Sequence, residues 1–505
     1  MPSKLETDRP AGPGDVGAAA AAAAGVAAEV AAAPSSARAG WLRAVADALD
    51  ARVDELAQVA DEETALGLPR LSGEVGRTTG QLRMFAEVIE EGSFLEVVID
   101  HADADATPPQ PDLRRMLQPL GPVAVFAASN FPFAFSTAGG DTASALAAGC
   151  PVIVKAHPGH PRTARATGHL VRAALADAGA PDGNFAVVEG FEAGKELVTD
   201  PHIAAVGFTG SLAGGRALFD LAVGRPDPIP FYGELGSLNP VVLSPGAITA
   251  RADELAAGLA GSFTLGVGQF CTKPGIVFVP EGGGTEDDDD GGGFEEAVAA
   301  AIGEPEPATM LYDGIAERFA DGLGSLSAGQ DVEVVAGDPA AAVAGREVSP
   351  VVLATSVAAV LAETDRLLEE CFGPTTLLAR YRDQQELLDA LAVFPGSLTA
   401  TLHAQPDEHA SLAPVVDALT RLAGRVIHAG WPTGVAVTWS QHHGGPWPST
   451  TAPLHTSVGA TAIRRFLRPV AYQDLPDAWL PDALREDNPL GLPRRVDGQL
   501  ELPRS

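Results

Sequence analysis

The sequence predicts an α/β protein of two or three domains. The chain has 505 residues, which is more than a single hydrophobic core usually holds. Between residues 121 and 223 short apolar runs of strand length alternate with stretches of helical spacing, and a second such block runs from about 240 to 437. This alternation is typical of parallel sheets covered by helices on both faces.

The first hundred residues are expected to be helices that cover another layer. Apolar residues recur there at helical spacing, with charged residues between them. The alanine-rich stretch 17–33 follows acidic residues, so it is expected to be a first helix or a flexible lead-in rather than a signal peptide. The lack of an export signal favours the cytoplasm. Three prolines within 106–111 predict a linker or a hairpin tip.

The first alternating block resembles a nucleotide-binding layout, although layout alone does not prove a nucleotide. Its expected strands are Val123–Ala127, Pro151–Lys155, Phe185–Val188 and Ala204–Phe208, and its expected helices are Thr142–Ala148, Thr163–Ala178 and Ala213–Val223.

The second block has four expected strands: Val241–Leu243, Ile276–Val279, Val351–Leu353 and Thr399–Leu402. Inside it, Glu281–Gly293 contains four consecutive aspartates. A calcium loop is conceivable, but the acidic spacing is not that of an EF-hand, so a solvated insertion is favoured. The apolar tail from Thr456 is expected either to pair with another subunit or to lie on the surface.

Composition excludes several classes of function. The net charge of −33 argues against nucleic acid and anionic membranes as partners, and we expect no transmembrane helix. Three cysteines in so long a chain indicate a reducing compartment and no disulfide framework. No metal-binding motif occurs, so no metal site is expected. For the pair His442-His443 a surface or packing role is favoured over ligation, because adjacent side chains point different ways.

Three residues are candidates for chemistry. Cys271 follows Gly268-Gln269 and is the expected nucleophile; the alternative is a small buried hydrophobe. Glu234 is the expected general base, for which a pKa raised by burial would be suitable, and otherwise a solvated turn residue. Asn130 is expected to stabilise an oxyanion together with the backbone N–H of Cys271, and otherwise to cap a strand end.

The order of the motifs resembles that of the aldehyde dehydrogenase superfamily. The matching segments are Asn130-Phe131-Pro132, Lys155, Phe208–Gly215, Glu234–Ser237, Gly268–Cys271 and Glu370–Pro374. One departure is Thr264, where the family usually has an aromatic residue. The resemblance implies a Rossmann-type cofactor domain (1–235), a catalytic domain (236–440) and a C-terminal segment (441–505). It also implies a small oligomerisation element that includes residues 105–120, in a homodimer or homotetramer.

The resemblance further implies an NAD or NADP cofactor. Its implied contacts are Lys155, Gly210, Ser211, Gly215, Glu370 and Phe372. The family usually has an acidic residue where this chain has Pro158, and such a carboxylate would repel a 2′-phosphate. NADP is therefore slightly favoured, with His157 and Arg162 as weak phosphate contacts.

The segments 230–240, 444–450 and 464–473 are similar to those of 2,5-dioxovalerate (alpha-ketoglutaric semialdehyde) dehydrogenases. This similarity implies oxidation of 2,5-dioxovalerate to 2-oxoglutarate in sugar-acid or pentose breakdown. An NADP-dependent fatty-aldehyde dehydrogenase is the alternative. A cysteine hydrolase, which would need a histidine beside Cys271, and a non-catalytic binding protein stay open as rivals.

Overall fold

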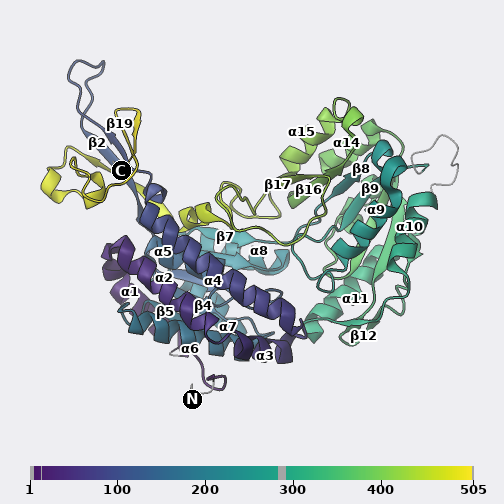
Figure 1. The fold of residues 1–505 in the computed structure, drawn as a ribbon, viewed down its shortest axis with the longest axis horizontal. Helices are drawn as coiled ribbons and strands as arrows, with labels where there is room; N and C mark the ends of the chain where they lie inside the picture. The colour runs from purple at the N-terminus through teal and green to yellow at the C-terminus, as the bar shows by residue number, and fades with distance from the viewer. Residues whose placement is uncertain (1–4, 13, 283–291, 503–505) are drawn as a thin grey trace.

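The computed structural model describes residues 5–12, 14–282 and 292–502. Figure 1 shows two α/β lobes and an extended arm that carries the C-terminus. Each lobe is built on its own mainly parallel sheet, and the arm contains a third sheet. The fold class predicted from the alternating pattern is therefore confirmed.

The first lobe contains a five-stranded parallel sheet with the strand order β5-β4-β3-β6-β7. The chain order reverses between β3 and β6, and ligands of open α/β sheets bind at such a switch point, beyond the carboxyl ends of the strands. The strands are β3 (Val123–Phe126), β4 (Val152–Lys155), β5 (Phe185–Val188), β6 (Ala205–Thr209) and β7 (Phe231–Glu234).

Helices cover both faces of this sheet. The N-terminal helices contribute a large shared core, in which Leu42, Leu82 and Phe85 are almost fully buried. The helices are α1 (Val16–Ala32), α2 (Ser35–Asp50), α3 (Val53–Thr64), α4 (Leu68–Glu91), α5 (Gly140–Ala148), α6 (Pro161–Asp177), α7 (Phe191–Thr199) and α8 (Leu212–Val223).

The second lobe contains a seven-stranded sheet with the order β11-β14-β15-β9-β8-β16-β17, parallel except for β11 at one edge. Its strands are β8 (Val241–Leu243), β9 (Ile276–Pro280), β11 (Glu333–Ala336), β14 (Val351–Ser356), β15 (Thr375–Tyr381), β16 (Ser397–His403) and β17 (Ala423–His428). Its helices are α9 (Pro245–Phe263), α10 (Gly292–Ile302), α11 (Asp313–Ser327), α12 (Val357–Ala362), α13 (Thr364–Leu367), α14 (Gln384–Val393) and α15 (Ala413–Leu422). A small sheet of β10 (Ala308–Thr309), β12 (Val343–Ala344) and β13 (Glu347–Val348) lies beside them.

The arm is a five-stranded sheet in which the C-terminal tail joins an early hairpin (Figure 1). Its order is β18-β2-β1-β19-β20, with β1 (Val98–Asp100), β2 (Leu113–Pro119), β18 (Leu467–Gln473), β19 (Arg494–Val496) and β20 (Gln499–Glu501). The prolines of 106–111 lie at the hairpin tip between β1 and β2, as one of the two alternatives predicted. Short 3-10 turns lie at Ser93–Leu95, Pro406–Glu408, Ala460–Phe466, Asp477–Trp479 and Asp482–Leu484.

Most predicted elements are present within one or two residues of their expected bounds, and the alanine-rich stretch is helix α1. Two elements of the first lobe were not predicted, α7 and β7. The four aspartates of 287–290 lie outside the described residues, so the expected insertion stays a prediction. No helix among the described residues is long and apolar enough to cross a membrane.

Candidate active site

The predicted site residues of the first lobe all lie at the carboxyl edge of its parallel sheet. Lys155 ends β4 and Glu234 ends β7, while Asn130 follows β3 and Ser211 follows β6. Because parallel strands end at one edge, motifs that are far apart in the sequence meet there. Glu234 and Asn130 are buried, with 4% and 9% of their surface exposed.

Cys271 lies in the loop between α9 and β9, and unusual backbone geometry shapes this loop. Gly266, Val267 and Gly268 have positive φ angles of 57°, 62° and 64°. A side chain on Gly268 would also collide with the backbone, since its Cβ would lie 2.3 Å from the carbonyl of Gly373. Glycine is therefore required both for the turn and for this close approach.

The carbonyl side of the loop is fixed by Asn239. Its side-chain amide donates to the carbonyl oxygens of Cys271 at 2.8 Å and Lys273 at 2.9 Å. The Lys273 ammonium in turn donates to the carbonyls of Cys371 and Thr375, at 2.9 and 2.8 Å. These bonds connect the cysteine loop to the Glu370–Pro374 motif.

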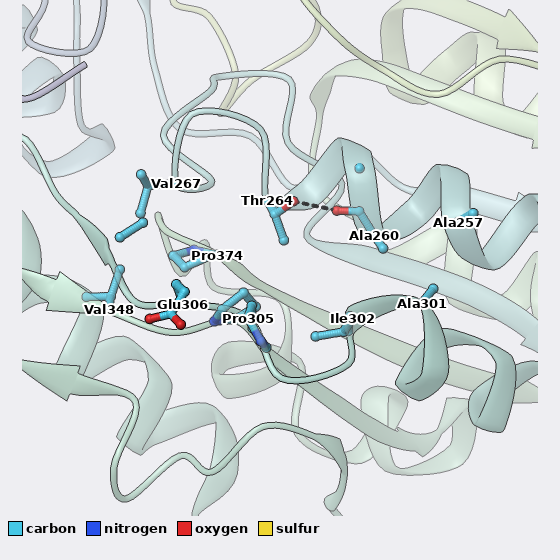
Figure 2. A pocket seen from close by; sticks show the side chains of 13 residues that line it. Ala257, Ala260, Thr264, Val267, Ala301, Ile302, Pro305, Glu306, Val348 and Pro374 are labelled. Carbon is cyan, nitrogen blue, oxygen red and sulfur yellow. Dashed lines mark hydrogen bonds between the residues drawn. The ribbon is translucent and has the colours of Figure 1, made fainter. Parts of the chain in front are cut away.

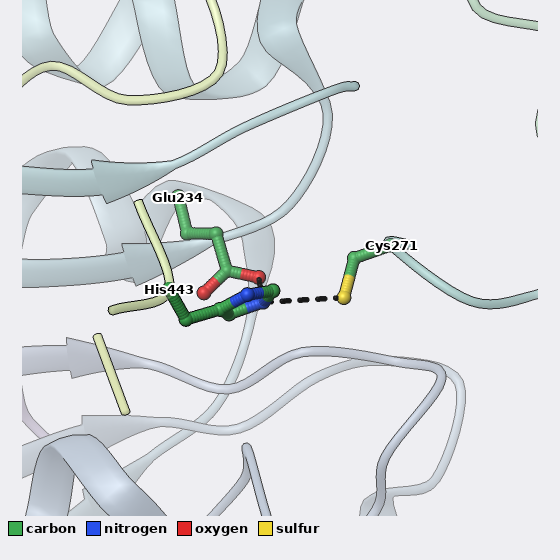
Figure 3. Close-up of side chains that lie close together, drawn as sticks. All are labelled: Glu234, Cys271 and His443. Atoms are coloured by element: carbon green, nitrogen blue, oxygen red, sulfur yellow. Dashed lines mark hydrogen bonds and ion pairs between the residues drawn. The ribbon is translucent and has the colours of Figure 1, made fainter. Parts of the chain in front are cut away.

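Cys271 and Glu234 meet at a histidine that sequence reasoning did not place in the site. His443 Nε2 lies 3.4 Å from Cys271 Sγ and 3.0 Å from Glu234 Oε1 (Figure 3). Ser457 donates a short hydrogen bond to the other oxygen of Glu234. The His443 side chain is fully buried, so its place is in the site and not on the surface. No sequence signal beyond the His442-His443 pair pointed to it.

The electrostatics of Glu234 differ from the expectation. Burial opposes ionisation of this carboxyl, but the charge of His443 and the hydrogen bonds from His443 and Ser457 outweigh it, and the pKa of Glu234 lies below its usual value. The raised pKa expected from the sequence is thus wrong, because the imidazole partner was not foreseen. Glu234 is ionised at neutral pH and ready to accept a proton.

The thiol of Cys271 shows the opposite shift. Burial, together with the negative charge of Glu234, raises its pKa well above the ordinary value for cysteine, and the nearby Arg77 only partly offsets this. A thiol of this kind is protonated at rest and needs a base at the moment of attack. His443 is the base within hydrogen-bonding reach.

Asn130 is held against the cysteine loop. Its side-chain amide donates to the carbonyl of Gln269 at 3.0 Å, two residues before Cys271. The second N–H of this amide is free to point elsewhere, and an amide at this position fits the predicted oxyanion donor. Gln269 is itself fixed, because its side-chain oxygen accepts from the backbone N–H of Leu311 at 3.1 Å.

The start of helix α8 is suited to an anionic group. Ser211 caps the helix by accepting from the N–H of Gly214 at 3.3 Å, and Gly210 precedes it as an exposed residue. The free N–H groups and the dipole of a helix start favour phosphate. Gly215 permits close helix–strand packing, since a Cβ there would lie 2.1 Å from Leu235 Cδ2.

Three of the predicted cofactor contacts lie near the end of β4: Lys155, His157 and Arg162. Lys155 is partly buried, its pKa is lowered by burial, and its side-chain ammonium makes no hydrogen bond within the described part of the chain. Burial lowers the pKa of His157 to about 2, so this imidazole is neutral and a poor phosphate ligand. Arg162 is already paired with Glu62 at 2.9 Å. Of the predicted contacts, Lys155 therefore fits the cofactor best.

Glu370 and Phe372, the other predicted cofactor contacts, lie in the segment between α13 and β15. Burial raises the pKa of Glu370 to about 7, with Lys273 and the backbone N–H of Ser237 opposing the rise. The carboxylate approaches Gly236 so closely that a Cβ there would lie 2.5 Å from its oxygen. Phe372 is half-buried against the core of the second lobe, as expected for a packing residue.

A cavity of about 440 Å³ has the lining side chains that Figure 2 shows, and Cys271, Glu234 and His443 are not among them. Its walls are mainly alanine, valine, isoleucine and proline side chains from α9, α10 and the β10–β13 region, with Glu306 as the one titratable group. It contacts the loop only through Thr264 and Val267. The candidate active site is the cluster around Cys271, and this cavity is separate from it.

Within the described residues, Glu234, Cys271 and His443 are the one group of three side chains whose ligand atoms lie close enough to hold a metal ion, within 4.8 Å of one another. Metal binding requires a deprotonated thiol, which the raised pKa of Cys271 disfavours. The sequence expectation of no resident metal stays a prediction.

Comparison with known proteins is consistent with this geometry. Residues 7–446 match the model of the aldehyde dehydrogenase family. The chain is 48% identical to the alpha-ketoglutaric semialdehyde dehydrogenase 2 of Azospirillum brasilense, over 93% of this chain and 88% of that protein. It is 42% identical to the alpha-ketoglutaric semialdehyde dehydrogenase of Acinetobacter baylyi, over 92% of this chain and 87% of that one.

Solved structures share the fold at low identity. An NADP-dependent enzyme of E. coli superposes with a TM-score of 0.75 at 22% identity, covering 92% of this chain and 90% of that chain. A gamma-glutamyl-gamma-aminobutyraldehyde dehydrogenase of Burkholderia cenocepacia superposes with a TM-score of 0.76 at 23% identity. The match covers 92% of this chain and 89% of that chain. At this identity the likeness establishes the fold alone.

Proposed function

Because the chain belongs to the aldehyde dehydrogenase family, and is therefore an oxidoreductase acting on aldehydes, we propose that it oxidises 2,5-dioxovalerate to 2-oxoglutarate. The observation that carries the substrate is the similarity, over nine-tenths of the chain, to two alpha-ketoglutaric semialdehyde dehydrogenases. The observation that carries the chemistry is the contact of His443 with both Cys271 and Glu234.

Cys271 acts first. Its Sγ bonds to the aldehyde carbon while the thiol proton passes to Nε2 of His443, which lies 3.4 Å away, in the tautomer that carries its ring proton on Nδ1. The imidazolium formed is stabilised by the ionised Glu234 at 3.0 Å. The carbonyl oxygen becomes an oxyanion, which accepts hydrogen bonds from the Asn130 amide and the backbone N–H of Cys271.

When bound, the nicotinamide cofactor supplies the hydride acceptor, so that the thiohemiacetal becomes a thioester. The residues present fit such a group: Ser211 and Gly215 offer a helix start to the pyrophosphate, Lys155 and Glu370 offer groups for ribose hydroxyls, and Phe372 supports the ring.

Glu234 acts in the second half of the reaction. Its carboxylate removes a proton from water, the hydroxyl oxygen bonds to the thioester carbon, and the C–S bond breaks to release the acid. The thiolate of Cys271 recovers its proton from His443. The low pKa of Glu234 keeps this base ionised over the whole neutral range.

We infer that both NADP and NAD are accepted, with NADP slightly favoured. Pro158 leaves no carboxylate where one would repel a 2′-phosphate. However, His157 is neutral and Arg162 is paired, so neither of the two predicted phosphate contacts supports a strong preference.

The surface of the arm is evidence in favour of a homo-oligomer. β18 and β20 are the edge strands of its sheet, and Trp479, Leu490 and Leu500 expose 75%, 54% and 64% of their surface nearby. Open strand edges and exposed apolar side chains are typical of a surface that pairs with a second copy. Light scattering after size exclusion would give the mass of a dimer or tetramer; a monomer would refute this.

Formation of reduced nicotinamide tests the proposal. The purified protein is supplied with 2,5-dioxovalerate or with a long-chain aldehyde, each with NAD and NADP, beside a Cys271→Ser control. A higher kcat/KM on the dioxo acid supports the proposal. Preference for the long-chain aldehyde moves the function to the fatty-aldehyde alternative, and unchanged turnover by Cys271→Ser refutes the mechanism.

A second candidate activity is favoured by one observation. The histidine that a cysteine hydrolase requires does lie beside Cys271, as His443. Ester hydrolysis without nicotinamide would use the same thiol and base. Release of nitrophenol from nitrophenyl acetate by the cofactor-free protein, absent in Cys271→Ser, tests this activity.

A further inference from the structure

One face of helix α4 carries polar side chains toward the segment that follows β3. Arg70, Glu74 and Arg77 are spaced by four and three residues and therefore share this face. Arg70 donates to the carbonyl of Asn130 at 2.7 Å, and the Glu74 carboxylate accepts from the backbone N–H groups of Phe133 and Ala134 at 2.8 and 3.0 Å. These contacts fix the helix face against the reaction site.

Several guanidinium N–H groups on this side of the site are buried without a partner. Nε and Nη2 of Arg77 and Nη1 of Arg70 have no hydrogen bond in the described part of the chain, and neither arginine forms an ion pair with a described residue. A buried cationic donor without an acceptor is costly, and such groups are normally paired. Glu74 lies on the same face but is bonded to the backbone and not to either arginine.

Aromatic rings connect these arginines to the reacting cysteine. The Arg77 guanidinium lies 5.4 Å from the centre of the Phe135 ring, which lies 6.4 Å from that of His443. The Arg70 guanidinium lies 5.0 Å from the ring of Phe270, the residue before Cys271. Ring contacts therefore connect both arginines to residues next to the thiol.

The electrostatics agree with this placement. The charge of Arg77 lowers the pKa of the Cys271 thiol against the stronger effect of burial. The Arg77 guanidinium therefore lies within electrostatic range of the reacting sulfur.

We propose that Arg77, assisted by Arg70, binds the carboxylate of the aldehyde substrate. The proposal rests on the proposed function and assigns the recognition of its charged end. In 2,5-dioxovalerate the carboxylate is separated from the aldehyde carbon by a short chain, so one molecule can reach both Arg77 and Cys271. A planar guanidinium with two free N–H groups matches a carboxylate in a two-bonded arrangement.

The effect of replacing Arg77 on the melting temperature distinguishes a binding role from a structural role. A binding residue that waits for its ligand destabilises the free protein, because burial of the Arg77 charge is only partly offset by the charges of Glu74 and Glu234 and two of its N–H groups lack an acceptor. Arg77→Met is therefore expected to leave the melting temperature of the free protein equal or higher. If Arg77 instead supported the fold, the same substitution would lower it.

The role of Arg77 is tested by the ratio of kcat/KM for the dioxo acid to kcat/KM for an aldehyde without a carboxylate. For wild type, Arg77→Met and Arg77→Lys, kcat/KM is measured with 2,5-dioxovalerate and with pentanal, which has the same chain length and no carboxylate. Losing hydrogen bonds to a charged group should lower the ratio of dioxo acid to pentanal by about tenfold to 150-fold in Arg77→Met, mainly through KM. Arg77→Lys, which keeps the charge, should lose less. Arg83→Gln is the control, because Arg83 is on the same helix but pairs with Asp47 and Asp50 at the surface.

Binding without turnover separates this proposal from the proposed function. Cys271→Ser protein is titrated with 2-oxoglutarate by calorimetry and by thermal shift, with and without Arg77→Met. Loss of binding in the double variant supports the assignment, even if the wild type fails to oxidise 2,5-dioxovalerate. Binding and substrate ratio that are both unaffected by Arg77→Met overturn the assignment, and turnover of the dioxo acid would then leave the proposed function standing.

Discussion

Replacing His443 should shift the pH dependence of turnover, because its imidazole contacts both reacting side chains. His443 Nε2 lies 3.0 Å from Glu234 Oε1 and 3.4 Å from Cys271 Sγ, and the ring is fully buried. His443→Ala removes both contacts and leaves the buried Glu234 carboxylate with Ser457 as its remaining side-chain hydrogen-bond donor.

The size of the shift follows from the lost hydrogen bond. A hydrogen bond to a charged group contributes about 1.5–3 kcal/mol. One pKa unit corresponds to about 1.4 kcal/mol, so the pKa of Glu234 should rise by about one to two units. Glu234 acts as a base only when ionised, so activity is present above its pKa and is lost as the pH falls through it. The acid limb of kcat should therefore move upward by the same amount.

The assay is the pH profile of kcat for the wild type, His443→Ala and His443→Gln. Glutamine places an amide donor near the position of Nε2 and fills much of the same space. The acid limb of the His443→Gln profile should therefore move less than that of the His443→Ala profile. Acid limbs that coincide in all three proteins, with kcat preserved, would refute the role assigned to His443.

Three further predictions concern other parts of the site. Asn130→Ala should lower kcat by about 100-fold to 1000-fold through loss of an oxyanion donor, with little change in cofactor affinity; an unchanged kcat would exclude this role. Cofactor affinity should increase as the pH rises through about 7, where Glu370 ionises and gains acceptor strength for ribose hydroxyls, and calorimetry on Glu370→Gln should find this dependence gone. Gly268→Ala should lower the thermal midpoint and the activity together. A left-handed backbone costs about 1–2 kcal/mol for a residue with a Cβ, and Gly373 occupies the space that the Cβ would need. A melting curve identical to wild type would contradict the close approach of Gly268 and Gly373.

The sequence predicted the parallel sheet of the first lobe well, because its buried strands are short apolar runs bounded by glycine or proline. β5 has the predicted bounds, Phe185–Val188, and β3 differs by one residue. β7 (Phe231–Glu234) was not predicted, because its Tyr-Gly-Glu sequence lacks the apolar pattern of a strand. It is defined instead by pairing with β6 over four residues.

The site could be predicted only where a local motif marks it. Cys271, Glu234 and Asn130 each lie in such a motif, and the fold brings them together. His443 comes from a segment without regular structure, 209 residues after Glu234, and no local pattern shows that it returns to the site. Arg77 resembles any charged residue of an amphipathic helix until its missing hydrogen-bond partners are seen.

The most direct test of the account is the mass of the protein trapped between its two half-reactions. Glu234→Gln removes the base for deacylation but keeps Cys271 and the cofactor residues. After mixing with 2,5-dioxovalerate and NADP, mass spectrometry should find one 2-oxoglutaryl group on the peptide that contains Cys271, formed together with one equivalent of reduced cofactor. Reduced cofactor formed at the wild-type steady rate, with no adduct on Cys271, would contradict the thioester mechanism and the role of Glu234.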